Sequence, residues 1–142
     1  RGPRRPCAPP AGQSAAGEAR KLVEFGNVDW ESEMFFLDTL DRALRDQQDS
    51  TAHVVVYGGR RGDRRGEVQA RMACIEDYML NRRGLGEGRL TVVHGGFRET
   101  PAVELWLVPP GGRAPAAKPT VKEKDVRFRK GEIKDWRSRC NI

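Results

Sequence analysis

The stretch that decides the fold is AHVVVYGGRRGDRRGEVQARMACIEDYMLNRRG, residues 52–84. It opens with a β-branched run, residues 52–57, which is typical of a strand buried on both faces. A segment of glycine and arginine ends that run. From about residue 67 to 83, apolar residues then recur at helical spacing. Gly84 follows where a left-handed residue commonly ends a helix. The stretch therefore predicts a buried strand, a glycine-rich loop and an amphipathic helix.

Elements of the same two kinds flank this stretch. Residues 22–25 suit a first strand, and residues 29–47 repeat leucine at helical spacing behind Asp29, a good N-cap. Two further strands are expected at residues 89–93 and 102–108. The order β-α-β-α-β-β predicts an α+β fold, a two-layer sandwich with both helices on one face of a mixed sheet. Extended basic arms are expected to flank it.

The composition divides the chain into three parts. Residues 1–19 are rich in Pro, Gly and Ala and predict a flexible arm. Residues 20–109 form the domain, and residues 110–142 form a linker and a basic tail. Within the tail, Phe128 and Trp136 are the candidate contacts to a partner, and docking of Trp136 onto the domain itself is the alternative. The sequence contains no apolar stretch long enough to span a membrane.

The basic residues are concentrated in the two arms. Residues 1–21 carry five basic residues against one acidic residue, and residues 113–142 carry ten against four. The part between them is acidic overall. Such arms attract anionic lipid head groups, acidic proteins or acidic polymers, the alternative being solvated charge that keeps the tails soluble. Nucleic acid is disfavoured as a partner, because no aromatic stacking surface accompanies the basic residues.

The three cysteines predict neither a metal site nor a cofactor site. Cys7, Cys74 and Cys140 show no spacing typical of metal ligands. Cys74 falls inside the second helical pattern and is expected to be a small buried hydrophobic residue. Cys7 and Cys140 lie in opposite arms, so a disulfide between them is a hypothesis that requires an oxidising compartment.

Nothing in the sequence supports catalysis. His53 and His94 lie at the two ends of predicted strands, and no Ser, Cys or Asp arrangement offers either of them a partner. Glu76 and Asp77 are adjacent on a helix and cannot face each other. We therefore predict a protein that is not an enzyme.

Several phrases resemble the outer-membrane protein A C-terminal-like domain. They are LDTLDRAL (37–44), VVVYGG (54–59), QARMACIEDYMLNRRGL (69–85), RLTVVHGGFRE (89–99) and VELWLV (103–108). Similar phrases occur in uncharacterised bacterial envelope proteins. The resemblance covers residues 20–109. It implies an extracytoplasmic location, in the periplasm or cell envelope, and binding of peptidoglycan.

The resemblance also implies a ligand site. Arg71 matches the helical arginine that binds the carboxylate of a diaminopimelate side chain in that family. The family's acidic residue falls at about Arg60, and Asp63 is the nearest acid that can replace it. The family's Asn and Leu-Ser positions in the loop are missing here.

The loop itself predicts an anion site. Arg60, Arg61, Arg64 and Arg65 stand among glycines just before a helix. Guanidinium forks and unpaired amides suit a carboxylate, a phosphate, a sulfated glycan or an acidic protein surface. The alternative is an exposed basic turn without a fixed partner.

These observations predict a non-catalytic binding or scaffold module of the cell envelope. It would hold an anionic or protein partner through the Arg/Gly loop and the arms. Two alternatives stay open: peptidoglycan binding through Arg71, and an accessory subunit of a larger membrane-associated complex with Trp136 and the arms inserted into neighbours.

Overall fold

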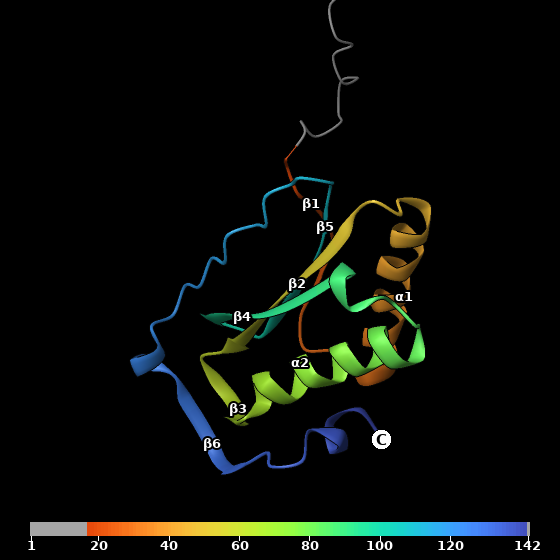
Figure 1. The fold of residues 1–142 in the computed structure, drawn as a ribbon. Helices are drawn as coiled ribbons and strands as arrows, with labels where there is room; N and C mark the ends of the chain where they lie inside the picture. Colours follow the sequence, from red (N-terminus) through yellow and green to blue (C-terminus); the bar gives the residue numbers. More distant parts are fainter. Residues whose placement is uncertain (1–16, 142) are drawn as a thin grey trace, which may run out of the picture.

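The computed structural model of the chain describes residues 17–141. Its main sheet has four strands in the order β1-β5-β2-β4 (Figure 1). They are β1 (Arg20–Phe25), β2 (Thr51–Gly59), β4 (Leu90–Arg98) and β5 (Ala102–Val108). Strands β2 and β4 are parallel and the other neighbours are antiparallel. With helices α1 (Trp30–Asp46) and α2 (Glu67–Asp77), this confirms the predicted α+β fold.

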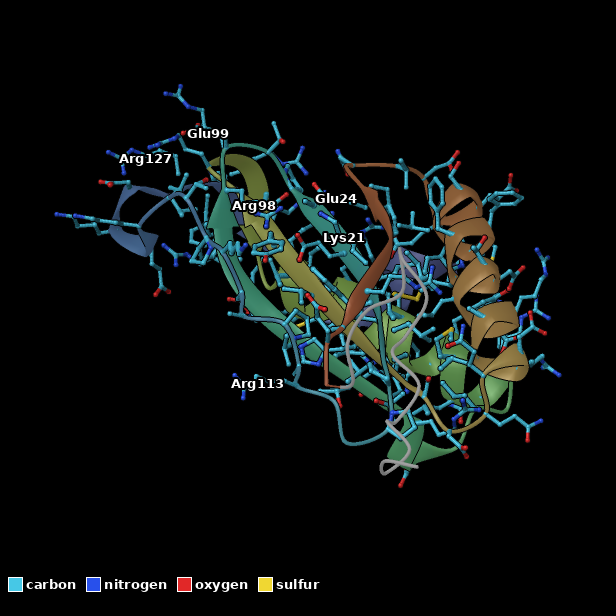
Figure 2. The ribbon with its side chains drawn as sticks, turned by 90° about the horizontal axis from the view of Figure 1, so that it is seen from above. Lys21, Glu24, Arg98, Glu99, Arg113 and Arg127 are labelled. Carbon is cyan, nitrogen blue, oxygen red and sulfur yellow. A yellow bond between two sulfur atoms is a disulfide. The ribbon has the colours of Figure 1, made fainter. Side chains whose placement is uncertain are left out.

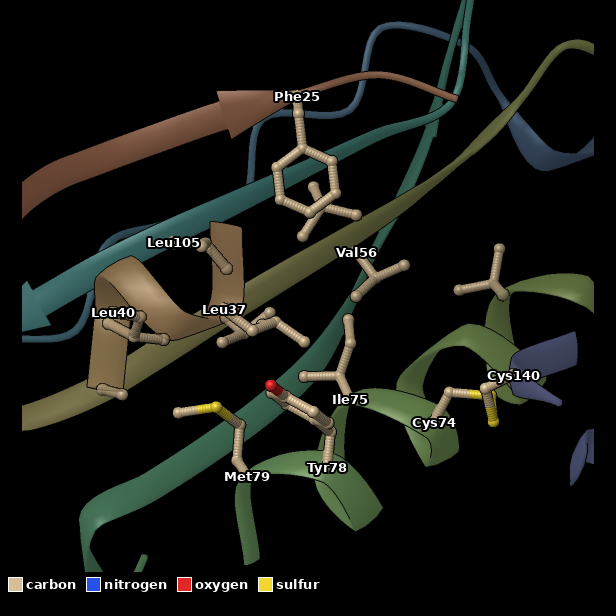
Figure 3. Close-up of a cluster of buried hydrophobic side chains, with 14 of the residues drawn as sticks. Phe25, Leu37, Leu40, Val56, Cys74, Ile75, Tyr78, Met79, Leu105 and Cys140 are labelled. Carbon is tan, nitrogen blue, oxygen red and sulfur yellow. A yellow bond between two sulfur atoms is a disulfide. The ribbon is translucent and has the colours of Figure 1, made fainter. Parts of the chain in front are cut away.

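The core explains why both helices lie on one face of the sheet. Because side chains alternate along a strand, Val54 and Val56 of β2 face the helices and pack in the main core (Figure 3). The leucines of α1 and Ile75 of α2 complete this layer. Val55 and Tyr57 point to the other face, where they form a smaller cluster with Ala102.

The ends of the helices follow the predicted signals. Asp29 caps α1, and its carboxylate accepts a hydrogen bond of 2.9 Å from the amide of Ser32. Helix α2 continues into a π-helical turn, η1 (Tyr78–Arg82), and Gly84 follows with φ of +71°. A short 3₁₀ turn, η2 (Glu87–Arg89), then leads into β4. The helical pattern expected at residues 67–83 is therefore confirmed.

A linker covers the face of the sheet that has no helix. The backbone amide of Lys118 donates a hydrogen bond of 3.0 Å to the hydroxyl of Tyr57. Nε of Arg98 donates one of 3.2 Å to the Lys118 carbonyl. This linker, residues 113–118, is called the strap below. Figure 2 shows the side chains of Lys21, Glu24 and Arg98 gathered on this face.

The C-terminal tail differs from the expectation of an extended arm. It contains a 3₁₀ turn, η3 (Glu123–Asp125), a strand, β6 (Arg127–Glu132), and a second 3₁₀ turn, η4 (Trp136–Cys140). Strand β6 pairs with β3 (Arg61–Arg65), a strand inside the predicted Arg/Gly loop. Buried Val121 and Val126 anchor the tail in the main core. The C-terminal tail is therefore packed on the domain.

The predicted disulfide is also wrong. Cys140 is bonded to Cys74 of α2 across a sequence separation of 66 residues, with 5.9 Å between the Cα atoms (Figure 3). It therefore has no thiol left for Cys7, which lies outside the described residues. Cys74 is buried as predicted, but as half of a disulfide. The bond joins the tail to helix α2 of the domain.

Among residues 17–141, no helix combines the length and the apolar character needed to cross a bilayer.

Candidate functional site

The Arg/Gly loop and the C-terminal tail form one two-stranded parallel sheet, which we call the basic ribbon. It consists of β3 (Arg61–Arg65) and β6 (Arg127–Glu132). Figure 1 shows the two strands side by side near the start of α2. The amide of Arg127 donates to the carbonyl of Arg60 at 2.8 Å, and that of Ile133 donates to the carbonyl of Arg65 at 2.9 Å. These two bonds close the ribbon at its ends.

Like charges face each other at two of the three paired positions of the ribbon, and the third sets Arg65 opposite Glu132. Arg61 lies opposite Arg127, and Arg64 lies opposite Arg129. Such pairs destabilise a sheet unless a counter-charge lies between them. Five cationic side chains of the ribbon are exposed and make no hydrogen bond or ion pair within residues 17–141: Arg61, Arg64, Arg127, Arg129 and Lys130. Their positive charge is therefore presented to solvent.

The inner face of the ribbon explains how this segment folds. The buried carboxylate of Asp63 accepts a hydrogen bond of 3.1 Å from the amide of Gly59. Half-buried Phe128 packs edge to face against Phe97, with 6.1 Å between ring centroids. The guanidinium of Arg65 lies 4.7 Å from the Phe128 ring centre. Since side chains alternate along β6, its arginines occupy the face opposite Phe128.

Arg60 does not belong to the unpaired set. Its Nη2 donates to Oε1 of Glu99 at 2.8 Å, and its Nε donates to Oε2 at 2.8 Å. These bonds raise the pKa of the guanidinium and lower that of the Glu99 carboxyl. Figure 2 shows Glu99 and Arg127 at the same end of the molecule. Of the four predicted loop arginines, Arg60 is thus neutralised and Arg65 is stacked on a ring.

Arg71 is buried, away from the open face of the ribbon. It is 4% exposed and belongs to an ionic cluster formed with Glu33, Asp63, Glu67 and Arg139. Burial lowers the pKa of Arg71, as does the nearby charge of Arg139, and the three carboxylates oppose this shift. The structure therefore brings Asp63 and Arg71 into one cluster, which is largely buried.

The cluster is incompletely paired. Glu33 is 1% exposed, and its Oε1 has no hydrogen-bond partner. Its other oxygen lies 3.9 Å from Nη2 of Arg139, whose Nε lies 3.3 Å from Oε2 of Glu67. Burial raises the pKa of Glu33, and the charges of Arg139 and Arg71 act in the opposite direction. Residues from α1, α2 and η4 thus share one buried site of imperfect geometry.

The two predicted partner contacts both pack within the chain. Phe128 lies under Arg65, and Trp136 is half-buried against the main core. Trp136 also borders a hollow of about 390 Å³ along the outer side of α2, lined with Gln69, Met72 and Leu80 among others. Both aromatic residues hold the tail on the domain.

Sequence reasoning missed the β6 half of the ribbon. Arg127, Arg129 and Lys130 were expected only as charge in an arm, whereas the structure places them beside Arg61 and Arg64. The available signal was the alternation of Phe128 with basic residues, a period-2 pattern with one apolar member.

The other hollows and titratable groups are less suited to binding a ligand. A hollow of about 460 Å³ lies between the strap and the sheet, bordered by Arg98, Glu104 and Trp106 among others. Nδ1 of His94 accepts a hydrogen bond of 3.0 Å from the amide of Gly96, and partial burial lowers its pKa. Within the described part of the chain, no cluster of His, Cys, Asp and Glu is arranged to hold a metal ion.

No family model matches the chain, and the searches of curated proteins and of solved structures likewise returned no match.

Proposed function

We propose that this protein is a non-catalytic binding module of the cell envelope that holds an acidic polymer on the basic ribbon. The observation that carries the proposal is the pairing of Arg64 with Arg129 and of Arg61 with Arg127, four exposed arginines that make no ion pair within residues 17–141. A sheet that places arginine opposite arginine gains stability when an anion lies between them. An anionic ligand therefore supplies what the ribbon lacks.

The shape of the charged surface favours a polymer over a small ion. A single exposed ion pair contributes little to binding, because water screens it. Five cations along two strands act together on a chain of repeated negative charge, and arginine forks hold carboxylate or phosphate oxygens in pairs. Binding should therefore fall steeply as salt rises, since the contacts are exposed.

Two observations support an envelope location. The Cys74–Cys140 disulfide is of the kind that persists in oxidising compartments. The phrases in residues 20–109 resemble a periplasmic family. Acidic polymers of the envelope are then the natural ligands for a surface of this charge.

The test is binding of the oxidised full chain to poly-L-glutamate and to long-chain polyphosphate, with neutral dextran as the control polymer. The double variant R64A/R129A should weaken binding about tenfold, with a shallower salt dependence. The matched control R20A/R42A removes two exposed arginines elsewhere and should bind like wild type. Absence of binding by the wild-type chain, or equal loss in both double variants, contradicts the proposal.

One observation favours the alternative of peptidoglycan binding. Arg71, which matches the family's arginine, and Asp63, the acid offered as a replacement for the missing one, lie in one electrostatic cluster. Burial of Arg71 means that η4 must move before a ligand reaches it. Pull-down with purified sacculi tests this alternative. Binding that is retained by R64A/R129A and lost in R71K, with unchanged melting temperature, would favour it over the ribbon.

A further inference from the structure

We infer that formation of the Cys74–Cys140 disulfide completes the basic ribbon, so that the oxidised chain binds acidic polymers and the reduced chain does not. This inference rests on the proposed function and specifies how the same site is regulated. Three of the five unpaired cations, Arg127, Arg129 and Lys130, belong to β6. The site therefore exists only while the tail stays beside β3.

The ribbon is too weak to hold β6 by itself. Within the described residues, β6 pairs with β3 alone, in a sheet of two strands. An isolated two-stranded sheet is marginally stable in water, and within β6 only Phe128 packs against the main core. Here the register shifts twice, between Arg61 and Arg64 and again between Arg64 and Arg65, and arginines face each other. Something outside the ribbon must keep the two strands together.

Downstream of β6 the non-covalent contacts are few: Trp136 is half-buried against the main core, and the other side-chain contacts of η4 with the domain are ionic. Arg139 reaches Glu67 at 3.3 Å and Glu33 only at 3.9 Å, and it adds a second positive charge near Arg71. Oε1 of Glu33 stays buried without a hydrogen bond in the same cluster. A buried ionic cluster with unsatisfied groups gives little net stability. Apart from half-buried Trp136, the docking of η4 therefore depends on the covalent bond.

The disulfide provides the missing restraint. Cys140 lies eight residues beyond the end of β6, and its bond to Cys74 fixes η4 against α2 (Figure 3). Upstream, Val121 and Val126 are buried in the main core. The far end of the segment between these anchors is held covalently in the oxidised chain, and after reduction only the packing of Phe128 and Trp136 and the ionic contacts of Arg139 remain there. Release is thus confined to residues 127–141.

The chemistry is a thiol–disulfide exchange with an external partner. On oxidation, the thiols of Cys74 and Cys140 give up two electrons and two protons to an external disulfide, which leaves as a dithiol. On reduction, an external dithiol returns them and becomes a disulfide. Both sulfurs belong to buried residues, so η4 must lift from α2 before the reductant reaches them.

The experiment compares the oxidised chain, the dithiothreitol-reduced and alkylated chain, and the C74S/C140S variant. Long-chain polyphosphate is the probe. We expect the two open forms to bind at least about tenfold more weakly than the oxidised chain, with a salt dependence reduced by about half. Amide exchange should show lost protection in residues 127–141 and retained protection in the main sheet. R64A/R129A should bind weakly in either redox state.

The outcomes separate this inference from the proposed function. If the oxidised chain does not bind, the proposed function fails. If the oxidised and open forms bind equally, the proposed function stands and the inference fails. Loss of protection throughout the domain on reduction also overturns the inference, because the bond would then support the fold as a whole.

Discussion

Nη2 of Arg98 donates a hydrogen bond of 3.0 Å to Oε2 of Glu104, on the face of the sheet that lacks helices. The hydroxyl of Tyr57 and Nε1 of Trp106 donate to the other carboxylate oxygen at 3.3 and 3.1 Å. Burial works to raise the pKa of Glu104, but the bonds from Trp106 and Arg98 prevail and lower it. An ionised carboxylate thus links two aromatic residues and the arginine that holds the strap.

Glu104→Gln should destabilise the domain by about 2 kcal/mol at neutral pH, because buried donors lose a charged acceptor. The folded pKa of Glu104 lies below its ordinary value of 4.5, so its charge stabilises the fold above that pH. The stability is lost as the pH falls through the folded pKa. Urea unfolding from pH 7 to pH 3 should therefore show wild type and variant converging in acid. Glu24→Gln, in the same network but more exposed, should cost much less.

Glu33→Gln should change the pH dependence in the opposite sense. The pKa of Glu33 is raised chiefly by burial, so the folded chain binds this proton more tightly than the unfolded chain. The contribution of Glu33 to stability therefore falls as the pH rises from 4.5 through the folded pKa. The variant lacks this titration. Denaturation between pH 4 and pH 8 should show wild type losing stability relative to it, while exposed Glu31→Gln should follow wild type.

Gly62, within β3, and Gly66, just after it, allow a comparison of two similar backbone conformations with different surroundings. Gly62 and Gly66 have φ of +90° and +86°, so a side chain strains the backbone at both positions. A Cβ at Gly62 meets open space, whereas one at Gly66 would lie 2.7 Å from the carbonyl oxygen of Ile133. Gly62→Ala should cost about 1 kcal/mol and Gly66→Ala clearly more. Thermal unfolding measures both costs. Equal costs would mean that Ile133 moves aside freely.

The main sheet and its helices were predictable because their residues report on local packing. Val54 and Val56 belong to a β-branched run that favours a buried strand whatever the distant contacts are. Leu37, Leu40 and Leu44 form one apolar stripe on a helix. Asp29 marks the start of that helix through a bond to a residue three positions away. Each of these signals lies within a few residues of the element that it predicts.

The tail was not predictable on the same grounds. β6 carries one large apolar residue, Phe128, and it pairs with a strand about 66 residues earlier that is almost wholly charged. Cys74 sits in a regular helical pattern, and nothing near it marks Cys140 as its partner. Arg71 is buried, and its surroundings include Arg139 of η4, far away in the sequence. The position of the tail is decided by contacts between residues far apart in the sequence, and most of these contacts are polar.

Arg129→Glu should stabilise the ribbon while weakening its binding. The change places a carboxylate opposite Arg64 and replaces a repulsive cross-strand pair with an attractive one. Such an exchange contributes about 0.5 kcal/mol. Arg64→Glu should act in the same way from the other strand, and the double variant should lose the gain, since two carboxylates then repel each other. Amide exchange across β3 and β6 measures the stability of the ribbon, and a polyphosphate titration measures its affinity for an acidic polymer.

Arg42→Glu, an equal charge change on α1, should leave ribbon protection unchanged. A ribbon weakened by both single variants would show that the facing arginines do not repel, and the electrostatic basis of the site would be wrong.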